Sequence, residues 1–256
     1  MTNNMLDEYS KELFATQFNR IMRGLRIGAS KSKSPKAFLL GGQSGVGKTR
    51  LQKILINKHG HNYIVINGDE YRSAHPNFTD IQKRYGLDAP AHTAKWAGEM
   101  VEALIDALST EGYNLIIEGT LRTASVPLQT AQLLRKKGYD VSLALMAVKP
   151  EISLVSCQIR YEQMRIAGTT PRAVDPAHHA KIVKEIVGNL EILEASDLFN
   201  TVALFNRAGA CLFQAKCPVK EKAASTALQD ILFGTWTEEE IVHHKKLIEQ
   251  LAVLNS

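Results

Sequence analysis

The sequence is poor in cysteine and contains no long apolar run. Its 256 residues include three cysteines, Cys157, Cys211 and Cys217, and five residues separate the last two. An odd count without metal-ligand spacing argues against a disulfide framework and a structural zinc site. The apolar segments 37–40 and 143–148 are much shorter than the ~18 to 20 residues that span a bilayer, so we expect no transmembrane helix.

The first residues also lack the basic start and apolar core of a secretory signal, so we expect a cytoplasmic protein. Neither sign of charge dominates, because 31 Lys and Arg residues stand against 26 Asp and Glu residues, a net charge of +5. This balance suits an anionic ligand, an acidic partner or simply a solvated basic surface. Aromatic residues make up 7% of the chain and do not interleave with a basic stripe, so nucleic-acid binding is not expected.

The two ends of the chain differ from its middle. Apolar residues from Leu6 to Leu25 recur at helical spacing, and the serine- and lysine-rich stretch 26–36 predicts a flexible linker, which makes this helix an appendage. Another amphipathic helix is expected at residues 237–254. We therefore divide the chain into an N-terminal helix and basic linker (1–34), a main domain (35–236) and a C-terminal helical extension (237–256).

In the main domain, short apolar runs alternate with longer amphipathic stretches. This pattern predicts a doubly wound α/β fold with a mainly parallel sheet flanked by helices. The expected strands cover residues 37–41, 63–67, 114–118, 141–148 and 201–206, and the expected helices cover 48–59, 91–111, 126–138, 151–164, 175–198 and 225–233. Ligands of such folds bind at the carboxyl ends of the strands, so the loops there should contain the functional residues.

A glycine-rich loop follows the first expected strand. It consists of Gly42, Gln43, Ser44, Gly45, Val46, Gly47, Lys48 and Thr49, the pattern G-x-x-x-x-G-K-T of a phosphate-binding P-loop. The glycines let the backbone curl so that successive N–H groups point at phosphate oxygens. Lys48 would contact the terminal phosphates and the Thr49 hydroxyl would ligate Mg²⁺. The loop therefore predicts a nucleoside triphosphate site.

Two acidic residues follow other expected strands. Asp69 comes just after strand 63–67, where its carboxylate could take the proton of an acceptor hydroxyl beside the γ-phosphate. The alternatives for Asp69 are a helix N-cap and a carboxylate on the Mg²⁺ side. Glu118 ends the run Leu-Ile-Ile-Glu, as in a Walker B element that organises Mg²⁺ directly or through water. An ordinary carboxylate at the end of a strand is the alternative for Glu118.

Arg160 and Arg172 lie about a dozen residues apart, on either side of a loop that contains Gly168. Their forked, permanent charges suit a lid that stabilises a phosphoryl group in transfer, although each alone also suits a surface ion pair. The pairs His178-His179 and His243-His244 predict surface or packing roles and not a metal site, because adjacent helical residues point in different directions.

Together these motifs resemble the zeta-toxin family, with the closest similarity to its PezT-like branch, the toxin half of epsilon–zeta toxin–antitoxin pairs. The resemblance extends from Leu6 to Trp236. The matching segments are 41–49, 64–69, 75–78, 112–123, 126–127, 129–131 and 159–162. This combination is far more specific than the P-loop alone.

The resemblance implies a bacterial kinase that uses ATP and Mg²⁺ to phosphorylate the amino-sugar 3′-hydroxyl of UDP-N-acetylglucosamine, blocking cell-wall precursor synthesis. It also implies a small antitoxin protein that occludes the ATP site. The implied catalytic residues are Lys48, Asp69 as the base, Arg160 and Arg172, with Thr49 and Glu118 at the Mg²⁺. The implied sugar-nucleotide pocket contains Glu102, Thr120, Arg122 and Thr130.

Other functions stay open at this point. The P-loop, Asp69 and the arginine lid also suit a P-loop kinase for another hydroxyl, such as that of an antibiotic or a polynucleotide end. A non-catalytic protein gated by ATP is a different class of function. Asp69 argues against that class, because a pure switch needs no acceptor base beside the γ-phosphate.

Overall fold

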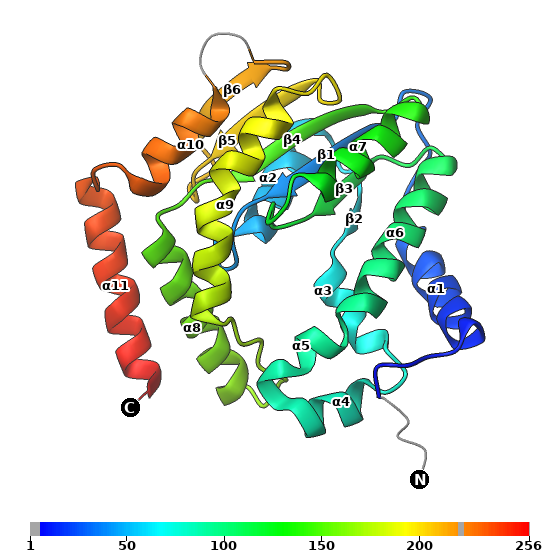
Figure 1. Ribbon diagram of the computed structural model, residues 1–256, viewed down its shortest axis with the longest axis horizontal. Helices are drawn as coiled ribbons and strands as arrows, with labels where there is room; N and C mark the ends of the chain where they lie inside the picture. Colours follow the sequence, from blue (N-terminus) through cyan, green and yellow to red (C-terminus); the bar gives the residue numbers. More distant parts are fainter. Residues whose placement is uncertain (1–5, 220–222, 256) are drawn as a thin grey trace.

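The computed structural model describes residues 6–219 and 223–255, and within them the chain forms one six-stranded sheet with helices on both faces (Figure 1). The strand order is β2-β3-β1-β4-β5-β6. The strands are β1 (Lys36–Gly41), β2 (Ile64–Ile66), β3 (Leu115–Glu118), β4 (Asp140–Met146), β5 (Thr201–Phe205) and β6 (Cys211–Lys216). β1 to β5 pair in parallel, and β6 is an antiparallel edge strand. The predicted doubly wound, mainly parallel fold is confirmed.

The register of the central strands brings the predicted site together. Leu40 of β1 lies opposite Glu118 of β3, and Gly41 lies opposite Leu145 of β4. The carboxyl end of β1, from which the P-loop departs, is therefore flanked by the end of β3. β2 pairs with the far side of β3, so Asp69, which follows β2, emerges at the same edge of the sheet.

The helices form two layers. One layer, with its core against Leu39, Ile117 and Leu143, contains α6, α7, α9 and α10, and α1 packs outside α6. The other layer contains α2, α8 and α11, against Phe38, Leu40 and the opposite face of the sheet. The longer helices are α1 (Lys11–Leu25), α2 (Lys48–His59), α4 (Phe78–Tyr85), α6 (Ala94–Thr110), α7 (Ser125–Lys136), α8 (Pro150–Ile166), α9 (Pro176–Glu194), α10 (Ala224–Phe233) and α11 (Glu238–Asn255).

Between β2 and α6 the chain forms a series of short helices that the sequence did not predict. They are α3 (Gly68–Tyr71), η1 (Arg72–Ala74), α4, η2 (Gly86–Asp88) and α5 (Ala89–His92). α4 has eight residues and the others have three or four, which is too short to show sustained helical periodicity, and helices of this length are stable only through their tertiary contacts. β6 was also missed, because this edge strand is largely exposed and buries no continuous apolar face.

The expectation that the first helix is an appendage on a flexible linker is wrong for the described residues. α1 begins at Lys11, after the Ser10 cap, and buries Met22 in the main core. The linker is bonded to the sheet edge: Ser30 and Asn62 exchange two hydrogen bonds of 2.8 Å, and Ser32 N donates to Gly112 O at 2.8 Å. The composition of the linker shows that it is polar, but it cannot show its hydrogen-bond partners, because these lie some 30 to 80 residues farther along the chain.

The C-terminal helix forms as predicted and lies along α8 (Figure 1). Leu247 of α11 and the preceding Trp236 pack against the core between α2 and the sheet. Lys149, which is buried, donates to Gly234 O at 2.7 Å and lies over the Trp236 ring. The helices of the described segments contain no stretch long and apolar enough to cross a membrane.

Candidate functional site

The P-loop connects β1 to α2 and has the backbone that its glycines predict. Gly42, Gly45 and Gly47 have positive φ angles of 132°, 76° and 106°. The loop passes close to α8, and a Cβ at Gly45 would overlap the carbonyl oxygen of Ser153. Gly47 is the N-cap of α2, so the positive end of that helix dipole points into the loop. Backbone shape and helix dipole together provide an anion site.

Lys48 lies at the first position of α2 and folds back over its own loop. Its ammonium donates to Gly42 O at 2.8 Å and to Gln43 O at 3.2 Å. Burial lowers the pKa of this ammonium, while the nearby carboxylates of Glu118 and Asp69 oppose the shift. Thr49, next in the helix, is exposed at the mouth of the loop. Lys48 is therefore held where a bound phosphate could replace two carbonyl acceptors.

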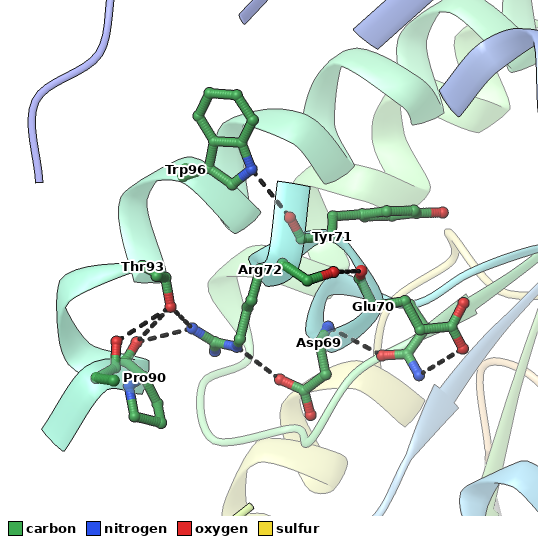
Figure 2. A network of polar contacts seen from close by, with 10 residues as sticks. Asp69, Glu70, Tyr71, Arg72, Pro90, Thr93 and Trp96 are labelled. Carbon is green, nitrogen blue, oxygen red and sulfur yellow. Dashed lines mark hydrogen bonds and ion pairs between the residues drawn. The ribbon is translucent and has the colours of Figure 1, made fainter. Parts of the chain in front are cut away.

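Asp69 lies in α3, immediately after β2 (Figure 2). The N-cap of this short helix is Asn67, whose side chain accepts from Asp69 N at 3.1 Å, so the N-cap alternative for Asp69 is wrong. Arg72 Nε donates to Asp69 Oδ1 at 2.9 Å. Burial raises the pKa of Asp69, but the hydrogen bond and charge of Arg72, with the charges of Arg172 and Lys48, lower it overall. The charges of these three residues therefore favour the ionised carboxylate.

Glu118 ends β3 beside the P-loop, as predicted. Gln52 of α2 donates to its Oε2 at 2.5 Å. Burial raises the pKa of Glu118, and the Lys48 charge opposes that shift. Among the described residues no cluster of three or more His, Cys, Asp or Glu side chains could hold a metal ion. A single carboxylate and the Thr49 hydroxyl nevertheless fit Mg²⁺, which usually completes its shell with phosphate oxygens and waters.

Of the two predicted lid arginines, one lies in the last two turns of α8 and the other in the loop that connects α8 to α9. Arg160 is on α8, and its Nε is buried without a hydrogen-bond partner in the described part of the chain. A buried charged donor of this kind lacks the acceptor that would compensate its desolvation, and a phosphoryl oxygen would supply one. Arg172 is exposed in the loop before α9 and lies close enough to Asp69 for its charge to lower the pKa of that carboxyl. The lid and the carboxylate therefore face the same space.

The four residues predicted for the sugar nucleotide lie on three elements. Glu102 is exposed on α6, Thr120 and Arg122 lie in the loop after β3, and Thr130 is on α7. Between Thr120 and Arg122, Leu121 has a φ of 54°, which is strained for a residue other than glycine. Asn189 Nδ2 donates to Leu121 O at 2.9 Å and holds this turn. The role of the four residues stays a prediction.

The side chain of Gln43 points away from the phosphate space. Gln43 is fully buried and donates from Nε2 to Val148 O at 2.9 Å and to Ser153 Oγ at 3.3 Å. Ser153 Oγ in turn lies 2.9 Å from His179 Nε2, and the His179 ring also hydrogen-bonds the Ser44 backbone. Burial lowers the pKa of His179. Gln43 and His179 therefore support the loop from behind, a packing role for His179, whereas His178 is exposed.

Arg207 is a site residue that the sequence analysis missed. It follows β5, where its Nε donates to Val46 O at 3.1 Å and its Nη2 donates to Gly45 O and, at 2.9 Å, to Ser156 Oγ. The guanidinium thus fixes two P-loop carbonyls against α8. Its position just after an apolar strand was the available signal, since ligand sites in such folds lie at the carboxyl ends of strands.

The comparisons with known sequences find relatives over most of the chain. Residues 20–217 match the family model described as Zeta toxin. The chain is 42% identical to Toxin PezT of Streptococcus pneumoniae over 236 aligned residues, and this alignment covers 92% of each protein. It is 37% identical over 248 residues to Toxin zeta of Streptococcus pyogenes, which covers 96% of this chain and 86% of that protein.

Solved structures agree with these relatives. A structure from the PezAT chromosomal toxin–antitoxin system of Streptococcus pneumoniae has a TM-score of 0.88 and 39% identity, and covers 97% of this chain and 99% of that one. A complex of AvrRxo1-ORF1 and -ORF2 with ATP has a TM-score of 0.60 at 14% identity, covers 95% of this chain and 84% of that one, and is similar in fold alone. Fold and P-loop together are those of a nucleotide-using, kinase-type phosphotransferase. The chain belongs to the zeta-toxin family.

Proposed function

We propose that this protein is an ATP- and Mg²⁺-dependent kinase that phosphorylates the amino-sugar 3′-hydroxyl of UDP-N-acetylglucosamine. The supporting observation is the arrangement of Lys48, Asp69, Arg160 and Arg172 around the P-loop. These side chains provide a cation for the phosphates, a carboxylate for the hydroxyl proton and two arginines for the charge of the transferred group. Membership of the zeta-toxin family supports the choice of acceptor.

In the proposed reaction the acceptor hydroxyl oxygen attacks the γ-phosphorus while the bond to the leaving ADP oxygen breaks. Asp69 accepts the hydroxyl proton, and Lys48 leaves the Gly42 and Gln43 carbonyls to contact the phosphates. Arg160 and Arg172 stabilise the negative charge spread over the phosphoryl oxygens. Thr49 and Glu118 would hold Mg²⁺, which neutralises phosphate charge when bound.

We also propose that the kinase is the toxin of a toxin–antitoxin pair, in which blocked cell-wall precursor synthesis is the toxic outcome. The relatives are described as toxins, and one solved relative comes from a toxin–antitoxin system. The expected partner is a small protein that occludes the ATP site. The net charge of +5 suits an acidic partner, since opposite charges accelerate and orient association.

The test uses purified protein without antitoxin, mixed with ATP, Mg²⁺ and UDP-N-acetylglucosamine, and follows the mass of the sugar nucleotide. A gain of one phosphate is expected. Asp69→Ala should lower kcat by about 10² to 10⁴-fold, the usual contribution of a general base, and leave ATP binding nearly unchanged. ATP binding without any sugar phosphate would contradict the proposed acceptor and favour another hydroxyl or an ATP-gated binding protein.

A further inference from the structure

Arg72 connects Asp69 to the junction between α5 and α6. Its Nε donates to Asp69 Oδ1 at 2.9 Å, and its Nη1 donates to Pro90 O at 2.7 Å and to Thr93 Oγ1 at 3.0 Å. Figure 2 shows the guanidinium between these acceptors and the carboxylate. The Arg72 side chain is 27% exposed, whereas that of Asp69 is 54% exposed. The partly buried arginine is therefore the anchored member of the pair.

The residues around Arg72 are buried and hydrogen-bonded to one another. Thr93 is buried and donates its own hydroxyl hydrogen to Ala89 O at 3.2 Å, which leaves its oxygen lone pairs for Arg72. Trp96 is fully buried, and its Nε1 donates to Tyr71 O at 2.9 Å. This bond ties α3 directly to α6. The segment with Asp69 and the anchor of Arg72 thus belong to one packed unit.

Without Arg72, little would hold the Asp69 carboxylate in one orientation. α3 has four residues, and the Asn67 cap fixes the backbone of Asp69 but not its side chain. Within the described segments the hydrogen bonds to this carboxylate reach Oδ1 and leave Oδ2 open. A half-exposed aspartate with one oxygen fixed and the other open is suited to receive a proton at a defined position.

We propose that Arg72 is a positioning residue, which holds Oδ1 of Asp69 so that Oδ2 is presented to the acceptor hydroxyl. This inference rests on the proposed function, in which Asp69 is the base. Arg72 also makes the carboxylate a weaker base, together with Lys48 of α2 and Arg172 of the lid. The neighbouring acidic group is Glu118 of β3, whose own pKa the Asp69 charge raises. Phosphoryl transfer tolerates a weak base, because positioning and charge stabilisation account for most of its catalysis.

Direct binding of an anionic substrate group is the other role open to an arginine here. Two of its three nitrogens, Nε and Nη1, already donate to protein acceptors. The two roles predict different kinetics. A positioning residue affects kcat and the pH profile, whereas a substrate contact affects the KM of the sugar nucleotide.

The experiment compares Arg72→Ala, Arg72→Lys and Thr93→Val with the intact chain, using ATP and UDP-N-acetylglucosamine. Arg72→Ala should lower kcat about 10- to 100-fold, while the KM values change less than about twofold. The acid limb of its pH profile should move to higher pH. Burial raises the pKa of Asp69, and the hydrogen bond and charge of Arg72 would no longer offset that rise. Arg72→Lys keeps the charge and should show a smaller shift of the limb, and Thr93→Val a smaller loss of kcat.

Arg26→Ala is the matched control. It also breaks an arginine–carboxylate pair, with Glu111, and this pair lies at the opposite end of α6. The 17 residues of that helix separate it from Thr93 by about 25 Å. The control should keep the kcat and pH profile of the intact chain. Circular dichroism checks that each variant is folded. If Arg72→Ala does not fold, Arg72→Lys takes its place in the kinetic comparison.

A second measurement does not depend on the substrate. The carboxyl ¹³C signal of Asp69, assigned through Asp69→Asn, reports its titration, and its pKa should rise in Arg72→Ala. An unchanged titration, or a raised KM without movement of the acid limb, would overturn the positioning role. Failure of the intact chain to phosphorylate the sugar nucleotide would instead refute the proposed function, and the NMR titration would still decide whether Arg72 controls Asp69.

Discussion

Among single residues, Gly45 of the P-loop occupies a position where a side chain would not fit. Gly45 has a φ of 76°, and a Cβ there would overlap the Ser153 carbonyl oxygen of α8. Gly45→Ala is therefore strained in its backbone and forces the loop away from α8. We expect ATP affinity, measured by calorimetry, to fall at least about tenfold, which corresponds to ~1.4 kcal/mol.

Gly188→Ala is the control for this substitution. Gly188 lies inside α9, and nothing comes within 4 Å of a Cβ built there. Alanine should therefore leave ATP affinity unchanged and raise the free energy of unfolding by about 0.5–1 kcal/mol. Equal ATP affinity of the Gly45→Ala protein and the intact chain would show that the loop can shift without cost.

The sequence could predict candidate site residues that belong to a contiguous motif or that directly follow a strand. Lys48 and Thr49 follow from the P-loop pattern, and Asp69 and Glu118 from their places after strands. The inward direction of the Gln43 side chain could not be predicted, because its partners Val148 and Ser153 are more than 100 residues away in the sequence. Contacts of that kind are set by the packing of α8 against the loop.

At the scale of elements, the loop after β5 fixes the P-loop to α8 through Arg207. Arg207→Ala removes bonds to Gly45 O, Val46 O and Ser156 Oγ. Charged donors of this type contribute about 1.5–3 kcal/mol each when buried acceptors depend on them. We expect ATP binding to weaken about tenfold or more, with kcat at saturating ATP less affected, because the loop is no longer preorganised for phosphate.

His243→Ala is the control on the other side of Arg207. The His243 ring lies 3.5 Å from Nη1 and is exposed, so its removal should change ATP affinity less than about twofold. Both variants are compared by titration with ATP in the absence of acceptor. Identical ATP affinities in Arg207→Ala and the intact chain would contradict the role of this loop.

The elements that the sequence did not predict share a physical property. β6 and the short helices from α3 to α5 have no long amphipathic period, and they are stabilised by neighbours distant in the sequence. Arg72 is the clearest example, because its acceptors Pro90 and Thr93 follow it by 18 and 21 residues. The long helices and buried strands were predicted because each has its own apolar face.

At the scale of the whole molecule, the N-terminal segment is part of the unit that positions Asp69. Tyr9 and Phe14 pack edge-on against Trp96, with ring centroids 4.8 and 5.2 Å away. Asn77 Nδ2 donates to Leu6 O at 2.9 Å. Since Trp96 also bonds to α3, the N-terminal segment, α6 and the site helix share one aromatic cluster. The proposed domain boundary at residue 34 divides the sequence but not this packing.

The same cluster makes the stability of the protein depend on pH. His75 is buried, its Nδ1 accepts from Asn77 N at 3.1 Å, and its ring lies edge-on to Trp96. Burial lowers the pKa of His75, and the Asp7 backbone opposes the shift. At this histidine the unfolded chain therefore binds a proton more readily than the folded chain. The contribution of His75 to stability is fully present above the ordinary histidine pKa and is lost as the pH falls below that value.

We expect the free energy of unfolding, measured with urea between about pH 8 and pH 5, to fall toward acid. His75→Asn should flatten this slope, because asparagine offers an acceptor to the backbone N–H two residues on but does not titrate. Burial raises the pKa of Glu118, so this residue favours the folded state toward acid, but only at the lower pH at which a carboxyl group titrates. An unchanged slope in His75→Asn would contradict the role of the aromatic cluster and leave the pH dependence to the other histidines whose pKa burial lowers, which are His59, His179 and His243.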